Sequence, residues 1–272
     1  MAPNIRFIID SSHGSAFNMA ADQFLLRNCI HGDTIFIRFY SWKVPSITLG
    51  CMQKPFEVLN AEKMGAQVEW IKRPTGGRAV LHFEDLTYSC IFPKTLKFMG
   101  SSVRESYNLI TRCLLKGLGY AGILCEAHDS YDQLLAVKRE VKLPCFLAPN
   151  RDEIMVKGRK LVGSAQRRGP DSILQHGSMP LTDYYRRLPE FLNLSVSEQE
   201  AQRSLLAQKS ICVHEITPNF DTETIVQSLI KGFVEILKLD YSEKKFSPDE
   251  LERIETESQS DQFLKKWHTG IA

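Results

Sequence analysis

The chain contains 272 residues, of which 43% are hydrophobic and 24% are charged, and its formal net charge is +2. This composition is typical of a globular protein large enough to bury a substantial core. The small net charge and the scattered basic residues argue against a dedicated nucleic-acid-binding protein. The first residues lack the apolar core of a secretory signal, and no run of about 18 apolar residues predicts a membrane-spanning helix.

Seven cysteines are spread along the chain, at positions 29, 51, 90, 113, 125, 145 and 212. An odd number at wide spacing does not indicate a disulfide framework, so we expect free thiols in a reducing cytoplasm. Cys125 and His128 have a spacing found in half of a zinc site. No second half follows, and we therefore predict no metal site.

In chain order, apolar residues at helical spacing predict a helix over 17–29, and the β-branched and aromatic stretch 34–42 predicts a strand. Pro55 opens a short predicted helix that runs to Met64. Alternation predicts a strand over 66–73 that leads directly into a Gly76-Gly77 turn. Residues 79–92 are then a pair of strands, or one strand with an irregular middle.

In the second half, an amphipathic helix is predicted over 101–118, ending at Gly119, and the two prolines within 136–150 predict a loop. Three strands follow over 152–181, with tight turns at Lys157-Gly158 and Gly169-Pro170. The chain from Thr182 onward is mostly helical, with a capping box at 247–250. Without a repeat or a clear linker, we expect one α+β domain over 1–272, with helices gathered on a mixed sheet.

Two stretches of the sequence contain candidate binding or catalytic residues. The first is KRPTGGRAVLH (72–82), whose Gly-Gly pair permits positive φ or close backbone approach to a ligand, although a plain turn is the simpler interpretation. It matches neither the GxxxxGK[ST] nor the GxGxxG nucleotide loop. The second is VKGRKLVGSAQRR (156–168), in which small residues at 163–165 interrupt a strand pattern. Such interruptions are typical of places where a backbone or ligand comes close.

Two reactive side chains are candidates for catalysis. Lys160 lies at the start of a strand, where a lysine is most often a solvated edge charge. We therefore expect Lys160→Ala to leave the fold intact. Cys145 lies between Pro144 and Phe146, and a nucleophilic cysteine needs a thiolate, which a nearby ammonium favours. A small buried side chain is the alternative for any one of the seven cysteines.

Four stretches together resemble the lipoate–protein ligase and octanoyltransferase family, whose catalytic domain also resembles biotin–protein ligase. They are IDSSHGSAFNMAADQFLL, IRFYSWKVPSITLGCMQ, KRPTGGRAVLHFEDLTYS and CFLAPNRDEIMVKGRKLVGSAQRRGPDSILQHGS, in the family's order over residues 9–178. The resemblance implies an α+β fold with a mixed sheet and flanking helices. The Cys-Phe pair upstream of GRKxxGSAQ is most similar to the LipM-type octanoyltransferases of this family.

This resemblance implies that an octanoyl group moves from acyl carrier protein, through a thioester on Cys145, to a lysine of a lipoyl-domain protein. The acceptor would be a protein such as glycine cleavage H protein or a dehydrogenase E2 subunit, and no cofactor is implied. Lys160 would stabilise the thiolate and the oxyanion. The implied substrate-binding residues are Arg73, Thr75, Gly76, Gly77, Arg78, Ala79, His82, Gly163, Ser164 and Ala165. Val80, Leu81 and Val162 are candidates for an acyl slot.

Three positions depart from the family pattern. Lys72 stands in place of a usual arginine, Gln23 in place of a usual glutamate, and Phe83 in place of an acidic residue, which leaves His82 without that orienting partner.

One alternative function is an ATP-dependent lipoate–protein ligase using Mg and ATP, in which Lys160 contacts an acyl-adenylate and the cysteine is incidental. Another is a non-catalytic protein that binds lipoyl domains.

Overall fold

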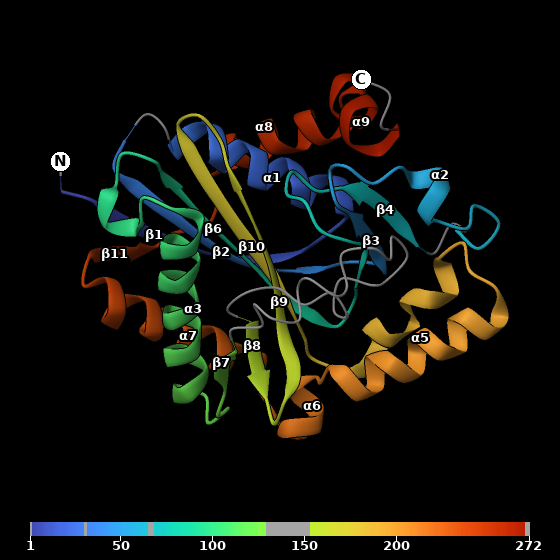
Figure 1. Ribbon diagram of the computed structural model, residues 1–272. Helices are drawn as coiled ribbons and strands as arrows, with labels where there is room; N and C mark the ends of the chain where they lie inside the picture. The colour runs from blue at the N-terminus through green and yellow to red at the C-terminus, as the bar shows by residue number, and fades with distance from the viewer. Residues whose placement is uncertain (1, 30–31, 65–67, 129–152, 270–272) are drawn as a thin grey trace.

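The computed structural model describes residues 2–29, 32–64, 68–128 and 153–269 (Figure 1). An eight-stranded sheet runs through its centre in the order β11-β1-β2-β6-β10-β9-β8-β7. The strands are β1 (Asn4–His13), β2 (Thr34–Trp42), β6 (Asp85–Pro93), β7 (Glu126–His128), β8 (Glu153–Val156), β9 (Arg159–Arg168), β10 (Ser172–Pro180) and β11 (Asp240–Glu243). Strand β1 pairs in parallel with β2 and β11, and the other neighbours are antiparallel. The prediction of an α+β fold with a mixed sheet is confirmed.

Helices cover both faces of this sheet (Figure 1). Helices α3 (Val103–Tyr120) and α7 (Thr222–Leu237) pack on one face, in a core that contains side chains of β1, β2 and β6. Helices α1 (Ser15–Asn28) and α8 (Pro248–Gln259) pack on the other face. Because both faces are covered, every residue of β6 and β10 is buried.

A second sheet of three strands, in the order β4-β3-β5, lies beside the first. Its strands are β3 (Ser46–Leu49), β4 (Glu69–Lys72) and β5 (Val80–His82). Its core includes residues of the 3-10 helix η4 (Asp183–Phe191), and helix α5 (Val196–Lys209) packs against η4. The two strands expected over 79–92 are present, but β5 and β6 belong to different sheets and do not pair with each other.

Shorter elements complete the described chain. They are α2 (Pro55–Val58), η2 (Lys97–Met99), α6 (Val213–Ile216), α9 (Asp261–Leu264) and η5 (Lys265–Thr269). Helix α2 ends six residues before the predicted end at Met64, because its carboxyl end turns into extended backbone at Leu59. The predicted loop over 136–150 lies outside the described residues.

Local sequence accounts for several element boundaries. The capping box predicted at 247–250 is present at the start of α8, and Ser102 with Glu105 forms another at the start of α3. The β8–β9 hairpin turns at Lys157 and Gly158, with φ of 49° and 72°, as a two-residue turn with positive φ requires. Helix α1 is different, since its first N–H is capped from a distant strand: the Ser15 N–H donates to the Glu69 carboxylate at 2.7 Å.

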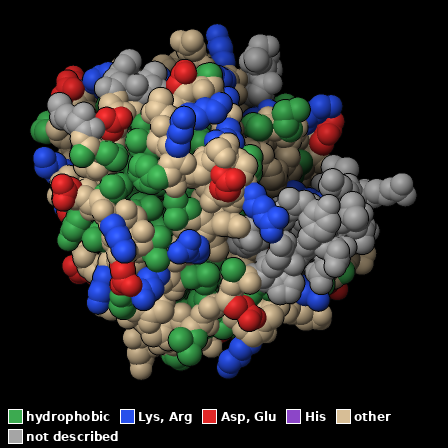
Figure 2. Space-filling model, turned by 60° about the vertical axis from the view of Figure 1, so that its left-hand side comes forward, with side chains coloured by type: hydrophobic (Ala, Val, Ile, Leu, Met, Phe, Trp, Pro, Cys, Tyr) green, Lys and Arg blue, Asp and Glu red, His purple; other side chains and the backbone are tan. Residues whose placement is uncertain are grey.

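Strands β1 and β11 were not expected from the sequence, and their parallel pairing places residues 4–7 beside residues 240–243 in one sheet. The single domain over 1–272 stays a prediction. In the described part of the chain, no helix is both long and apolar enough to cross a bilayer. On the face shown in Figure 2, Lys and Arg side chains are mixed with Asp and Glu and do not form a continuous basic stripe.

Two glycines bring α3 and α7 into backbone contact. A Cβ atom at Gly232 would lie 2.4 Å from the backbone nitrogen of Gly117 and 2.5 Å from the carbonyl oxygen of Cys113. Neither atom can move without shifting its helix. We therefore expect Gly232→Ala to lower the free energy of unfolding by about 1–3 kcal/mol, as overpacked cores do.

Gly119 provides the matched control on α3, because a Cβ atom there would meet nothing within 4 Å. Gly119→Ala should raise the free energy of unfolding by about 0.5–1 kcal/mol, since alanine loses less backbone freedom on folding. Urea unfolding followed by circular dichroism measures both changes. Equal stability of the two variants would contradict the close helix contact.

Candidate active site

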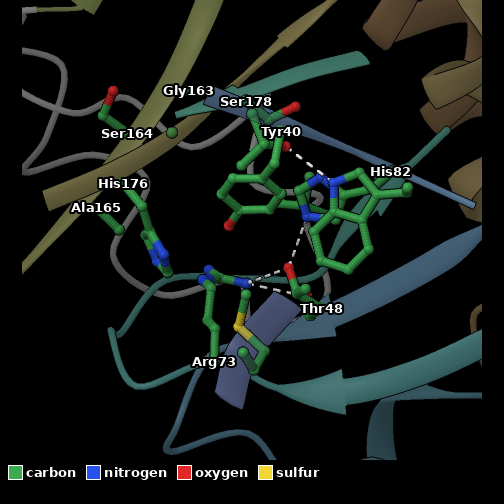
Figure 3. A pocket seen from close by; sticks show the side chains of 14 residues that line it. Tyr40, Thr48, Arg73, His82, Gly163, Ser164, Ala165, His176 and Ser178 are labelled. Atoms are coloured by element: carbon green, nitrogen blue, oxygen red, sulfur yellow. Dashed lines mark hydrogen bonds between the residues drawn. The ribbon is translucent and has the colours of Figure 1, made fainter. Parts of the chain in front are cut away.

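A narrow pocket lies between the two sheets (Figure 3). It contains about 370 Å³ of empty space, a volume that includes the part open to solvent. It is lined by Met19, Tyr40, Trp42, Thr48, Arg73, Val80, His82, Thr87, Gly163, Ser164, Ala165, His176, Gly177 and Ser178. These residues come from α1, from strands of both sheets and from the segment after β4, so the site exists only when the two sheets are assembled.

One wall of the pocket is built from small residues on adjacent strands. Residues 163–165 of β9 pair with Ser178, Gly177 and His176 of β10, in that order. Figure 3 shows this wall across the pocket from Thr48 and His82. A Cβ atom at Gly177 would lie 2.6 Å from Ser164 Oγ and 2.8 Å from the carbonyl oxygen of Gly163. The glycine is therefore required by the close packing of this wall.

His82 is held in place on three sides. Its ring stacks on Trp42 with centroids 4.3 Å apart, and its Nε2 lies 2.9 Å from Thr48 Oγ1. Its Nδ1 lies 2.8 Å from Asp85 Oδ2. The expectation that His82 lacks an orienting carboxylate is wrong, because Asp85 at the start of β6 supplies it in place of residue 83. A carboxylate accepts the Nδ1 proton, so in the neutral ring Nε2 accepts from the Thr48 hydroxyl.

Arg73 braces the Gly-Gly loop. Its guanidinium donates to the carbonyl oxygens of Gly76 and Arg78, at 2.9 and 2.8 Å, and to that of Thr48 at 2.9 Å. A planar guanidinium can serve several acceptors at once, which a lysine ammonium cannot do in the same geometry. Gly77 adopts φ of 96°, a value that strains other residues. The loop is therefore a fixed structure held from inside the site.

A network of buried polar side chains lies behind the pocket. Arg38 is fully buried and forms ion pairs with Asp10 at 2.8 Å and with Asp22 at 3.2 Å. It also donates to the side chain and the carbonyl oxygen of Asn18, at 2.7 and 3.1 Å, and its guanidinium stacks on Tyr40. These contacts satisfy a charge that would otherwise be costly to bury.

This network reaches the pocket through His176. The Nδ1 of His176 lies 3.5 Å from Asp22, and its Nε2 lies 2.7 Å from Thr75 Oγ1 in the Gly-Gly loop. Burial lowers the pKa of His176, although Asp22 opposes this shift, so the ring is neutral at pH 7. Burial alone would raise the pKa of Asp22, but hydrogen bonding from His176 and the charge of Arg38 outweigh it and lower that pKa.

Lys160 is buried, with 2% of its surface exposed, and its Nζ lies 2.5 Å from Glu153 Oε1. The expectation of a solvated charge at an exposed strand edge is therefore wrong. Strand β8 covers one side of the lysine strand, and Ile211 donates to the Lys160 carbonyl oxygen at 3.0 Å on the other side. Removing one partner of a buried ion pair typically costs about 3–5 kcal/mol, so Lys160→Ala should not be neutral for stability.

The structure separates the predicted binding residues into two groups. Arg73, His82, Gly163, Ser164 and Ala165 line the pocket together. The others belong to the loop beside it: Thr75 and Ala79 are buried, Gly76 and Gly77 are exposed, and Arg78 is half-buried. Of the acyl-slot candidates Val80 lines the pocket, whereas Leu81 and Val162 pack into the cores. Cys145 lies outside the described residues.

Sequence reasoning missed several pocket residues, including Thr48, His176 and Ser178, and it missed Glu153 as the partner of Lys160. The His-Gly-Ser triplet of β10 carried a usable signal, since small and polar residues interrupt an apolar strand there as they do at 163–165. Glu153 carried no such signal, because a single acidic residue near a turn is common. Among the described residues, no group of three or more His, Cys, Asp and Glu could hold a metal ion.

Comparison with known proteins gives consistent matches. The model of the lipoyl protein ligase A/B catalytic domain matches residues 15–234. The chain is 34% identical to octanoyltransferase LipM of Bacillus anthracis over 265 residues, which cover 93% of each protein. Its fold is similar to a lipoate-protein ligase A bound with ATP, with a TM-score of 0.77 and 19% identity over the whole of both chains. It is also similar to a bipartite lipoate protein ligase of Thermoplasma acidophilum, studied with its E2 lipoyl domain, with a TM-score of 0.77 and 17% identity over 96% of both chains.

The buried histidine predicts a pH dependence of stability. The unfolded chain takes up a proton at His176 below about pH 6.5, whereas the folded protein resists it, because the pKa is lowered. The free energy of unfolding should therefore fall as the pH drops below about 6.5, with a contribution of at most about 1.4 kcal/mol per pH unit. Protonation of Asp22, whose pKa is lowered in the folded protein, also lowers the free energy of unfolding as the pH drops, but only near pH 4 and below.

Urea unfolding of the wild type and of His176→Gln at several pH values between 5 and 8 isolates this contribution. The variant should show a shallower pH dependence below about pH 6.5 and run parallel to the wild type above about pH 7.5. Identical slopes throughout would show that His176 titrates alike in the folded and unfolded states.

Proposed function

Because this chain belongs to the lipoyl protein ligase A/B catalytic domain family, we propose that it is an octanoyltransferase that modifies a lysine of a lipoyl-domain protein. The similarity to octanoyltransferase LipM extends over 93% of both chains, so it includes the pocket and the lysine strand. The observation that carries the proposal is the buried Lys160 ammonium on β9, the strand whose next residues form a wall of the pocket. A buried cation on a strand that also lines a narrow pocket suits a reaction in which negative charge develops on an acyl group.

The proposed reaction has two steps. In the first, the Cys145 thiolate attacks the carbonyl carbon of the octanoyl thioester on acyl carrier protein, and the C–S bond to the carrier breaks. The carrier leaves as a thiolate that takes up a proton from water. In the second, the neutral amine of the acceptor lysine attacks the enzyme thioester, loses a proton to solvent and displaces the Cys145 thiolate. A thioester is replaced by an amide, which is downhill, so the cycle needs no ATP.

Lys160 would stabilise the negative charge in both steps. The charge appears on the attacking thiolate and on the oxyanion of each tetrahedral intermediate, and removing one such donor typically costs about 3 kcal/mol of activation free energy. Burial increases this effect, because surrounding water screens the ammonium less than it would at the surface. The pocket between the sheets would hold the octanoyl tail, with Val80 and Met19 among its apolar lining residues.

Five of the described cysteines are poor candidates for the nucleophile, because the pKa values of their thiols are raised. Burial raises the pKa of the Cys29 and Cys212 thiols to about 11. It raises the pKa of Cys113 and Cys125 to about 12, and it raises the pKa of Cys90 as well. These five side chains are protonated at pH 7 and are poor nucleophiles.

Two cysteines remain, the half-buried Cys51 and Cys145, which lies outside the described residues. The Cys-Phe pair that resembles the octanoyltransferase motif contains Cys145, which supports it as the residue that carries the acyl group. All six described cysteines are free thiols, in keeping with our proposal of a cytoplasmic enzyme.

An ATP-dependent lipoate–protein ligase is the second candidate function. The similarity to a lipoate-protein ligase bound with ATP favours it at the level of the fold. At 19% identity that similarity says nothing about chemistry, whereas the match to an octanoyltransferase is at 34%. A non-catalytic lipoyl-domain-binding protein is less well supported, because the buried lysine pair is costly and a binding role gives no reason for it.

The first prediction from this proposal concerns Cys145. Incubation with octanoyl-acyl carrier protein without nucleotide should add the mass of one octanoyl group to the protein, because the thioester forms on the enzyme. Cys145→Ser and Cys145→Ala should lose both this adduct and turnover. Cys51→Ser and Cys113→Ser are matched controls and should keep both. Intact-mass spectrometry measures the adduct, and transfer at the normal rate by Cys145→Ala would disprove the thioester mechanism.

The second prediction distinguishes transferase from ligase. Free octanoate or lipoate with Mg-ATP and a lipoyl-domain acceptor should give little or no modified acceptor, because a transferase does not activate a free acid. Octanoyl-acyl carrier protein without ATP should modify the same acceptor. Mass spectrometry of the acceptor is the measurement. Efficient ATP-dependent modification that survives Cys145→Ala would replace the transferase assignment with the ligase.

A further inference from the structure

Glu153 is a buried carboxylate that the mechanism above does not use. It is 8% exposed, it begins strand β8, and its Oε1 lies 2.5 Å from Lys160 Nζ. A charge-assisted contact of this length is among the strong hydrogen bonds of proteins. An ammonium has three N–H donors on a flexible stem, so engaging one of them restricts where the other two can point.

The backbone around this pair is also specialised. The β8–β9 pairing shifts register by one residue between the Ile154–Val162 and Met155–Lys160 pairs. Such bulges change the direction of a side chain and are frequent beside active sites. The extra residue is Leu161, so the register shift lies next to Lys160 in the chain. The adjacent hairpin turn and the hydrogen bond from Ile211 to the Lys160 carbonyl oxygen hold the lysine backbone on both sides.

We propose that Glu153 is the positioning residue for acyl transfer: it fixes the Lys160 ammonium in the direction of the developing oxyanion. This inference rests on the proposed octanoyltransferase function. Glu153 forms no bond to the acyl group and acts only through Lys160. The carboxylate balances the buried positive charge, while the register shift and the ion pair together set where that charge points.

The test measures the rate constant of acyl-enzyme formation at saturating octanoyl-acyl carrier protein, together with KM for this donor. Glu153→Gln keeps the shape of the side chain but removes its charge, so the ammonium loses its fixed direction. The rate constant should fall on the order of 100-fold, as small misplacements of catalytic groups do, with KM unchanged. Glu153→Asp keeps the charge and should recover part of the loss. Glu215→Gln is the matched control, since Glu215 pairs with the neighbouring Arg159 at 3.0 Å, and it should react at the wild-type rate.

A second arm asks whether Glu153 acts through the lysine. In the Lys160→Ala background, Glu153→Gln should cause no further loss, because two residues that act as one unit are not additive. A merely structural role would lower the rate by the same factor in both backgrounds and would overturn the proposal. If Glu153→Gln gives no cooperative unfolding transition, Glu153→Asp replaces it, and a lower rate constant at unchanged KM is then the supporting result.

The outcomes separate this inference from the function on which it rests. If Glu153→Gln forms the acyl-enzyme as fast as the wild type does, the positioning role is overturned and the octanoyltransferase function stands. Absence of any acyl-enzyme in the wild type would overturn the function, and the positioning role with it. A loss confined to KM would also overturn the proposal, because it would place Glu153 in donor binding.

Discussion

The buried guanidinium of Arg38 is the contact on which the arrangement of the site depends. A fully buried charge is tolerated only when its donors are satisfied, and Arg38 meets this requirement with Asp10 on β1 and with Asn18 and Asp22 on α1. Three elements are thereby fixed relative to one another by directional contacts, which hydrophobic packing alone does not supply. The position of α1 on the sheet follows from this requirement.

The same network determines where the Gly-Gly loop lies. Asp22 faces His176 on β10, and His176 in turn contacts Thr75 in the loop. On its other side the loop is held by Arg73, whose guanidinium donates to two carbonyl oxygens of the loop and to that of Thr48. The loop beside the pocket is therefore tied to the core of the large sheet and to the small sheet at once. Such preorganisation suits a site that must hold an acyl group in one orientation.

Much of the fold could be predicted because its signals are local. The strand over 34–42 appears with the expected bounds, the helix over 101–118 and the capping box at 247–250 are present, and the hairpin at Lys157-Gly158 follows from turn chemistry. Strands β1 and β11 were missed: β11 depends on pairing with β1, more than 200 residues away in the chain, and β1 pairs with both β11 and β2. The division of residues 79–92 between two sheets was missed for the same reason, because alternation shows a strand but not its partner.

By itself, the sequence determined the composition of the site: a glycine loop with its arginine, a lysine strand with small residues, and a cysteine upstream. These motifs follow one another along the chain in the order that is typical of the lipoate–protein ligase and octanoyltransferase family. Only the tertiary structure decided which of these side chains meet. It buried Lys160 against Glu153, gave His82 its carboxylate from Asp85, and left Gly76 and Gly77 beside the pocket instead of inside it. The physical reason is that charge compensation and hydrogen bonding depend on distance in space, and strand pairing brings together residues that no local pattern connects.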